Sequence, residues 1–397
     1  MNDFFKRSWV LVNLDALKYN FETIRERVEP SSKIMAIVKA DAYGHGYERV
    51  VNELRDDGCD WFGVSNLEEA LQVRAVCADK PILILGYTPP KYASRLALNN
   101  ISQTVFNLSY AHRLSEYAVE EGVQVSVHIK IDTGMSRLGF QYQDSERDID
   151  SVDEVAEVCA LPNLYHEGIF THFASADETK VSGEVFTRLQ FDLFLNIIEK
   201  LRLRGITFDY RHCCNSAATL IYPEMHLDMV RTGIITFGLY PSDDLKDRIK
   251  LLPVMEFKTV ISMIKTIRAG TPVSYGSKFT AEKDMRIATV PVGYADGYPR
   301  SLSGSDMLYK GKRVPIIGNI CMDQCMLDVS GIENASEGKT VTVFGRSGDD
   351  EITIDSLAEK LGTINYELIC GISKRVPRIY TRNDEIESIT DYISSMQ

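Results

Sequence analysis

The chain has 397 residues, of which 44% are hydrophobic and 25% are charged, and its formal net charge is −12. This length allows two domains, and the composition is that of an ordinary soluble globular protein. The negative charge argues against nucleic acid as a partner, because phosphate binding requires a basic face. No apolar stretch approaches the roughly 18 residues of a membrane helix, and the N-terminal segment carries charges where a signal peptide has its apolar core. We therefore expect a cytoplasmic protein that binds neither a membrane nor nucleic acid.

The first 245 residues alternate between apolar runs typical of buried strands and segments with helical periodicity. The predicted strands cover 33–39, 61–65, 81–85, 101–106, 123–131, 165–171, 208–212 and 229–237. Predicted helices cover 14–28 and, among others, 67–77, 109–121, 151–159 and 183–204. A doubly wound sheet would also alternate in this way, but the chain has no GxGxxG turn. Eight strand–helix units over about 240 residues favour a (β/α)8 barrel of the TIM type.

From about Lys246 the pattern changes to strand-like runs punctuated by glycines. These runs cover 254–267, 286–292, 313–317, 321–329 and 340–344, and one helix is predicted over 354–361. We expect the polar residues after about Arg382 to fray. We therefore predict a barrel domain at 10–245 and a mostly antiparallel β domain at 246–385, with residues 1–9 packing with the β domain.

The eight cysteines are scattered, with no CxxC pair and no histidine cluster at zinc spacing. Most of them lie among apolar residues, as buried free thiols do. We therefore expect no metal site.

The stretch AIVKADAYGHG, residues 36–46, ends a predicted buried strand on Lys39 and continues into a tight turn before a helix at 47–54. A lysine at the carboxyl end of a barrel strand lies where α/β folds place their chemistry. An exposed lysine without a function is the alternative, and this stretch alone does not decide between them.

In the run VHIKID, Lys130 alternates with Val127, Ile129 and Ile131 and so points to the opposite face. In a closed barrel that face is the interior, where an unpaired ammonium is expensive. Pairing with Asp132 is the simplest way to satisfy it.

Polar residues also follow the later predicted strands, in GIFTHFASAD (168–177), HCCNSAA (212–218) and MVRTGII (229–235). The ends of strands 7 and 8 form the usual phosphate site of such barrels. Ser216 and the backbone at Gly233 and Ile234 are suitable donors, although Asn215 and Ser216 could also be a helix cap.

The stretch 36–46 resembles the lysine signature of the alanine racemase family, whose fold-type III members depend on pyridoxal 5'-phosphate (PLP). Further segments resemble that family in the same order, from Val10 to about Tyr380. They are VHIKIDTGMSRLGF (127–140), the three polar segments above, VSYG (273–276), VGYADG (292–297), ICMDQ (320–324) and NYE (365–367). Asn319 departs from the pattern, because many members have arginine there.

The resemblance implies roles around the cofactor. Lys39 forms a Schiff base with PLP, and Tyr43 contacts its phosphate. Arg231 faces the pyridine nitrogen, and since arginine does not readily give up a proton, the ring is a weaker electron sink than in the decarboxylases of this fold. The other cofactor-binding residues implied are Arg137, His172, Asn215, Ser216, Gly233, Ile234 and Tyr366.

The resemblance also implies the substrate contacts. Arg137, Met322 and Tyr294 bind the substrate or line its access, and Lys130 is a candidate for carbamylation, which would fix Arg137 in place. Tyr275 is the catalytic tyrosine. A tyrosine base needs cationic neighbours, because the reference pKa of tyrosine is about 10, and His172 hydrogen-bonded toward Arg231 is our candidate for this support.

We therefore predict a racemase that interconverts L-alanine and D-alanine through an external aldimine of PLP, with Lys39 and Tyr275 as two bases on opposite faces. The resemblance implies a homodimer with shared active sites, in which Tyr275 and Met322 reach the cofactor of the partner, and a role in supplying D-alanine for peptidoglycan precursors. The alternatives are a serine or broad-specificity racemase, against which Tyr366 argues mildly, a decarboxylase, and a non-catalytic PLP-binding protein. The last would lack the β domain and the tyrosine loop.

Overall fold

The computed structural model describes residues 7–178 and 180–393. It divides into two compact units. The barrel unit consists of Leu17–Ala42 and Tyr47–Leu252, and the β unit consists of the residues before Leu17, Tyr43–Gly46 and the residues from Pro253 onward. The short turn Tyr43–Gly46 thus belongs to the β unit although the chain on both sides of it belongs to the barrel unit.

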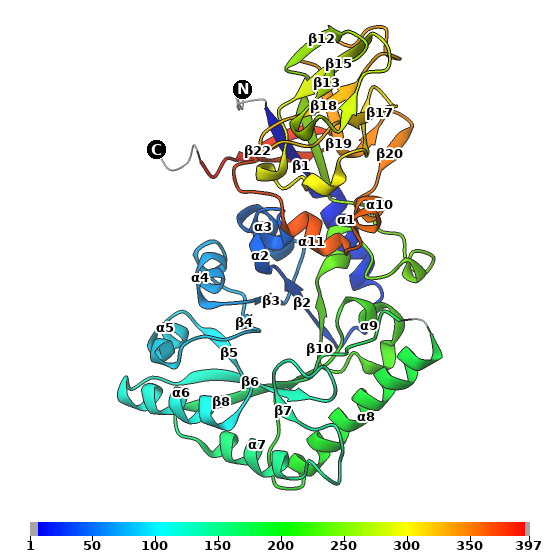
Figure 1. Ribbon diagram of the computed structural model, residues 1–397. Helices are drawn as coiled ribbons and strands as arrows, with labels where there is room; N and C mark the ends of the chain where they lie inside the picture. The colour runs from blue at the N-terminus through cyan, green and yellow to red at the C-terminus, as the bar shows by residue number, and fades with distance from the viewer. Residues whose placement is uncertain (1–6, 179, 394–397) are drawn as a thin grey trace. The chain divides into compact units, whose positions relative to one another are not determined.

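Eight parallel strands form the barrel unit (Figure 1). In chain order they are β2 (Lys33–Ile37), β3 (Trp61–Val64), β4 (Ile82–Ile84), β5 (Ile101–Val105), β6 (Val125–Asp132), β8 (Leu164–Phe170), β9 (Tyr210–His212) and β10 (Met229–Thr232). Each strand from β2 to β8 pairs with the next one in this series, β10 pairs with β2, and the two-residue strand β7 (Phe140–Gln141) pairs with β6. Backbone hydrogen bonds from Asp228 N to Arg211 O and from Arg231 N to Cys214 O, both 3.1 Å, link β9 and β10. The predicted parallel barrel is therefore confirmed and is nearly closed.

Helices follow the strands and cover the outside of the barrel, as Figure 1 shows for α4 to α8. They are α1 (Leu14–Arg25), α3 (Tyr47–Asp56), α4 (Leu67–Val76), α5 (Ala93–Leu98), α6 (Leu108–Glu120), α7 (Asp150–Ala160), α8 (Val181–Arg202) and α9 (Ser216–Ile221). Four of them begin directly after an asparagine whose side chain accepts a backbone N–H of the first turn, namely Asn13, Asn66, Asn107 and Asn215. These caps explain where those four helices start.

An 11-stranded, mostly antiparallel sheet forms the β unit. Its strands are β1 (Ser8–Asn13), β11 (Met255–Val260), β12 (Met263–Ile267), β15 (Met285–Val290), β16 (Asp306–Tyr309), β17 (Lys312–Ile317), β18 (Cys325–Asp328), β19 (Thr340–Ser347), β20 (Asp350–Ile352), β21 (Arg378–Arg382) and β22 (Glu385–Thr390). Only β1 and β21 pair in parallel. A small hairpin, β13 (Pro272–Val273) and β14 (Phe279–Thr280), and two helices, α10 (Ile354–Leu361) and α11 (Asn365–Cys370), complete it.

Several local predictions need correction. The run 254–267 is two strands, β11 and β12, rather than one. The residues after Arg382 do not simply fray, because β22 pairs with β21 up to Thr390. Of the segment 1–9, expected to pack with the β unit, the strand β1 starts at Ser8 and pairs there, whereas residues 1–6 lie outside the described part of the chain.

Five of the eight cysteines are buried, and all eight are free thiols. In the described ranges, no helix combines the length and the hydrophobicity that crossing a membrane would require. The same residues contain no group of three or more His, Cys, Asp or Glu side chains placed to hold a metal ion.

Candidate active site

Lys39 lies two residues beyond the end of β2 and begins a left-handed turn, rather than closing the strand as predicted. Ala40, Asp41 and Ala42 have φ between 52° and 57°, a conformation that costs each non-glycine residue roughly 1–2 kcal/mol. Hydrogen bonds hold the turn, since Ala40 N donates to Glu69 Oε1 at 2.8 Å and Ala42 N donates to Val38 O at 2.9 Å. The backbone that carries Lys39 is thus fixed by its surroundings against its local preference.

Arg231 lies on β10, which runs beside β2 in the barrel unit (Figure 1). Its side chain is buried, and both of its terminal nitrogens make hydrogen bonds. Its Nη1 lies 2.9 Å from His212 Nδ1, and its Nη2 lies 3.2 Å from His172 Nδ1 and donates to Thr171 O at 2.9 Å and Cys213 O at 3.0 Å. Burial lowers the pKa of Arg231 to about 10. The group therefore remains a cation at neutral pH, and the expected contact with His172 is present.

The two histidines that contact Arg231 are kept neutral. Burial, followed by the Arg231 guanidinium, holds the pKa of both His172 and His212 well below the usual range. Lys130, Arg137 and Lys39 also act on His172 in the same direction. Four basic side chains thus disfavour a charge on one imidazole.

A chain of hydrogen bonds continues from His212 away from Arg231. His212 Nε2 lies 2.9 Å from His128 Nδ1, and His128 Nε2 lies 3.2 Å from Glu167 Oε2, which also accepts from Ser102 Oγ at 2.5 Å. Because the carboxylate can only accept, His128 donates from Nε2 and accepts at Nδ1, and His212 donates from Nε2 and accepts from Arg231. The chain therefore connects the guanidinium to a carboxylate through two neutral imidazoles.

Four side chains of this hydrogen-bonded chain were not predicted as site residues, namely His128, Glu167, Ser102 and His212. A signal existed for His128, since it alternates with the same apolar residues as Lys130 and so belongs to the same interior face.

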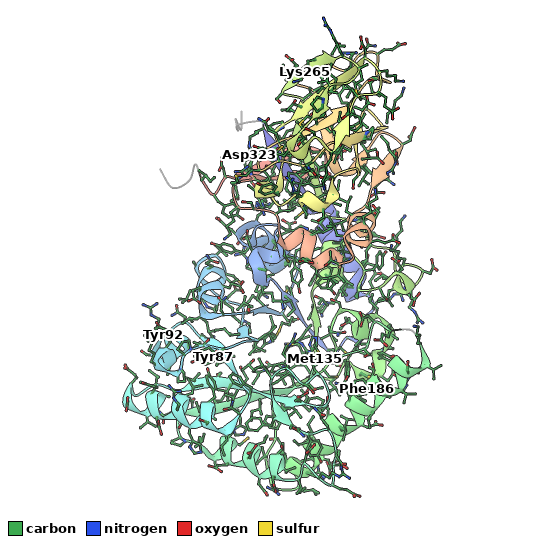
Figure 2. All side chains as sticks on the ribbon, viewed as in Figure 1. Tyr87, Tyr92, Met135, Phe186, Lys265 and Asp323 are labelled. Carbon is green, nitrogen blue, oxygen red and sulfur yellow. The ribbon has the colours of Figure 1, made fainter. Side chains whose placement is uncertain are left out.

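Lys130 is buried on β6, where Nζ donates to Ile131 O at 2.7 Å and lies 5.4 Å from the Phe170 ring centroid. Burial, followed by repulsion from Arg231, lowers the pKa of Lys130 to about 7. Asp132, the expected partner, instead accepts backbone N–H groups of the following turn. That turn holds Met135, labelled in Figure 2 together with Phe186 of α8, and leads to the exposed Arg137.

The phosphate-site candidates lie together at the ends of β9 and β10. Gly233 N donates to Ser216 Oγ at 2.9 Å, and a 3-10 turn begins at Ile234. Asn215 Oδ1 accepts from Ala218 N at 3.0 Å, so Asn215 caps α9. The cap and a phosphate site are therefore compatible, because different atoms serve them.

In the β unit, the Tyr43 and Tyr366 rings lie 6.1 Å apart, and burial followed by Tyr366 raises the pKa of Tyr43. Two side chains hydrogen-bond to the backbone of the turn after Tyr43. Arg378 Nε donates to Gly44 O at 2.9 Å, and Tyr380 Oη donates to His45 O at 3.1 Å. Gly44 has φ +80°, and a Cβ there would clash with Ile369 O. Only glycine fits this position.

The remaining candidates of the β unit are exposed, with 69% of Tyr275, 53% of Met322 and 42% of Tyr294 accessible. Tyr294 N donates to Cys321 O at 3.2 Å, so the two predicted substrate segments adjoin. Tyr275 lines a pocket of about 560 Å³, to which Lys265 (Figure 2) also contributes.

Both units match models of one protein family. Residues 12–241 match the alanine racemase N-terminal domain, and residues 254–380 match the alanine racemase C-terminal domain. The chain belongs to the alanine racemase family. An alanine racemase of Methanococcus maripaludis is 43% identical over 373 residues, which are 94% of this chain and 98% of that protein.

Solved structures agree with this assignment. The alanine racemase of Clostridium difficile 630 superposes with a TM-score of 0.93 at 39% identity, covering 98% of this chain and all of that one. A histidine racemase from Leuconostoc mesenteroides superposes with a TM-score of 0.85 at 30% identity, covering 96% and 100%. The family resemblance, the fold class and the prediction of an isomerase are therefore confirmed, and the family is one that depends on PLP.

Proposed function

We propose that the chain binds PLP and racemises alanine, with Lys39 and Tyr275 as the two bases. The observation that carries the proposal is the buried Arg231, whose guanidinium donates to four acceptors. Arg231 lies on β10, which pairs with β2, the strand that leads to Lys39. The names of the relatives support alanine as the substrate.

The residues fit PLP in the chemistry of their donors. Lys39 offers a primary amine for the aldehyde. Ser216 Oγ, to which Gly233 N donates, and the backbone of the Gly233–Ile234 turn would supply donors for the phosphate, and Tyr43 and Tyr366 would bind it as well. When bound, the cofactor withdraws electrons from the amino acid and acidifies its α-hydrogen. Asn215 would hold the phosphate segment through its cap.

Arg231 would hold the pyridine nitrogen. It can donate a hydrogen bond, and with a pKa of about 10 it gives up its proton in only about one molecule in a thousand at pH 7. Arg231 would thus give that nitrogen a hydrogen bond without transferring a proton to it. This arrangement disfavours the decarboxylase alternative, which requires a carboxylate at that position.

Two bases on opposite faces are what inversion at the α-carbon needs. Tyr275 would remove the α-hydrogen of L-alanine and Lys39 would return a proton on the other face, with the roles reversed for D-alanine. His172 beside Arg231 would support the tyrosine base, and Arg137 with Met322 would orient the substrate carboxylate. Tyr294 would line the access to the site.

A site shared between two copies would explain the exposure of the β-unit residues. Tyr275 and Met322 are large side chains that are more than half exposed, and we propose that they complete the active site of a second copy in a head-to-tail homodimer. Sedimentation at the concentration of the activity assay tests this, and an active monomer refutes it.

The experiment that tests the activity is incubation with L-alanine or D-alanine in deuterated water, followed by chiral analysis. Borohydride reduction and peptide mapping should locate the cofactor on Lys39 and lose it in Lys39→Ala. Tyr275→Phe should slow α-hydrogen exchange from L-alanine more than from D-alanine. Equal loss from both isomers contradicts the assignment of Tyr275.

A broader racemase is the second candidate, because a histidine racemase has this fold at 30% identity. We propose that Tyr366, whose ring lies 6.1 Å from that of Tyr43, leaves less room for a larger substrate and so favours alanine. Comparing kcat/KM for alanine, serine and histidine decides between them. Bound PLP without exchange of any of these substrates would instead support a non-catalytic carrier.

We further propose that the chain acts in the cytoplasm and supplies D-alanine for peptidoglycan precursors. Expression in a bacterium that requires D-alanine should restore growth without it. Racemase activity in the lysate without such rescue would contradict the proposed role while leaving the activity intact.

A further inference from the structure

The Tyr275 side chain receives little support from its own packing. Its ring is 69% exposed, and it lies in the short turn Tyr275–Ser277 between β13 and β14. Both neighbours have left-handed backbone, with φ +66° at Ser274 and +74° at Gly276. The position of the phenol therefore depends on what holds the backbone of this turn.

Asn319 holds that backbone from the facing segment. Its side chain is buried, and Nδ2 donates to Tyr275 O at 2.6 Å. In return, Ser274 Oγ donates to Asn319 O at 2.6 Å. Only the nitrogen of the amide can donate to a carbonyl oxygen, so the acceptor fixes the amide orientation.

The residue before Asn319 keeps the two segments close. Gly318 has φ +69°, and a Cβ there would lie 2.7 Å from Val273 O and 2.8 Å from Ser274 Cβ. The contact is therefore backbone against backbone, with two reciprocal hydrogen bonds across it. These bonds offset the cost of the left-handed conformation at Ser274.

We propose that Asn319 is a positioning residue for Tyr275, which sets the phenol oxygen by fixing the carbonyl of the same residue. The proposal rests on the proposed function, in which Tyr275 is one of two bases. A misplacement of about 1 Å at a reacting group can cost about 100-fold in rate. Because Lys39 is the other base, the loss falls on one direction of exchange only.

The test measures α-hydrogen exchange from L-alanine and D-alanine separately, in the full-length protein loaded with PLP. Asn319→Ala should slow exchange from L-alanine by about 10- to 100-fold and leave exchange from D-alanine within about threefold. Asn319→Asp should be slower still, because it keeps the shape of the side chain but faces the Tyr275 carbonyl with an acceptor. Tyr309→Phe, which removes a partly buried hydrogen bond to Asn334 O elsewhere in the β unit, is the control and should leave both rates unchanged.

A second measurement does not depend on the activity. Amide hydrogen exchange of the segment 272–280 should become faster in Asn319→Ala and stay at the wild-type rate in Tyr309→Phe. Equal loss of both exchange directions, or protection of 272–280 unchanged in Asn319→Ala, overturns the positioning role while the proposed function stands. Absence of exchange from either isomer in the wild type refutes the proposed function and this inference with it.

Discussion

Lys130 should react with carbon dioxide at neutral pH. With a pKa of about 7, half of its amine is neutral at pH 7, whereas an ordinary lysine is neutral in about one molecule in 3,000. The neutral amine attacks carbon dioxide, a nitrogen–carbon bond forms, and the released proton goes to solvent. The product is an anion, so the charges of Arg231 and Arg137 that disfavour the ammonium would stabilise it.

The assay is a ¹³C NMR spectrum in labelled bicarbonate, which should contain a carbamate resonance that is lost in Lys130→Met. Lys258→Met is the matched control. Lys258 is also buried, but its Nζ lies 2.7 Å from Glu256 Oε2 and donates to Thr342 and Arg346. An ammonium with a carboxylate partner has no reason to react, so this variant should keep the resonance.

The low pKa of Lys130 also predicts how the stability of the fold depends on pH. In buffer free of carbon dioxide, the unfolding free energy should rise between about pH 7 and pH 10, because the unfolded lysine keeps a proton that folded Lys130 has lost. The slope is at most about 1.4 kcal/mol per pH unit. Lys130→Met should remove it. No carbamate resonance at saturating bicarbonate, or a resonance that survives in Lys130→Met, would refute the reasoning.

Three further predictions concern the same framework. Glu167→Gln should lower the unfolding free energy by about 1–3 kcal/mol, because it removes the carboxylate from the buried chain of imidazoles. Glu157→Gln, which removes the carboxylate of an exposed pair with His112, should change it little. Equal effects of the two variants in urea titrations would contradict this. Gly44→Ala should destabilise more than Gly58→Ala, since both have positive φ but only the former meets a backbone carbonyl; comparable melting temperatures would argue against a clash. The unfolding free energy should also fall as the pH drops below about 6.5, because unfolded histidines take up protons that His212 excludes when buried; equilibrium unfolding at pH 5.5 and 7.5 measures this, and His212→Asn should reduce the difference.

The sequence predicts the barrel well because most strands are short apolar runs and several helices begin after a capping asparagine. It predicts the backbone of Lys39 poorly. Nothing in Ala40–Tyr43 signals a left-handed turn, since the segment has no glycine or asparagine, and the turn depends on Glu69, about 30 residues further along the chain. The edge strand β22 is missed for a related reason, because half-exposed polar residues look like a fraying end until the partner strand is known.

Local sequence patterns predict some of the site residues, whereas others are brought in only by contacts between distant segments. Lys130 is found by alternation along one strand, and His128 follows from the same rule. Glu167 and Ser102 join them only through the pairing of neighbouring strands, a non-local property. Asn319 gives no sign of holding Tyr275 in the sequence, because 44 residues separate them.

The charges of the barrel unit show what kind of ligand it suits. The chain as a whole carries −12, yet four basic side chains of this unit lower the pKa of His172, namely Lys39, Lys130, Arg137 and Arg231. Among the described residues, every hydrogen-bond acceptor of Arg231 is neutral, and the nearest carboxylate reaches it only through two imidazoles. Arg231 is buried, and a buried cation with only neutral acceptors is costly, so an anion should stabilise this site strongly. A phosphate, a substrate carboxylate and a carbamate on Lys130 would each supply that charge.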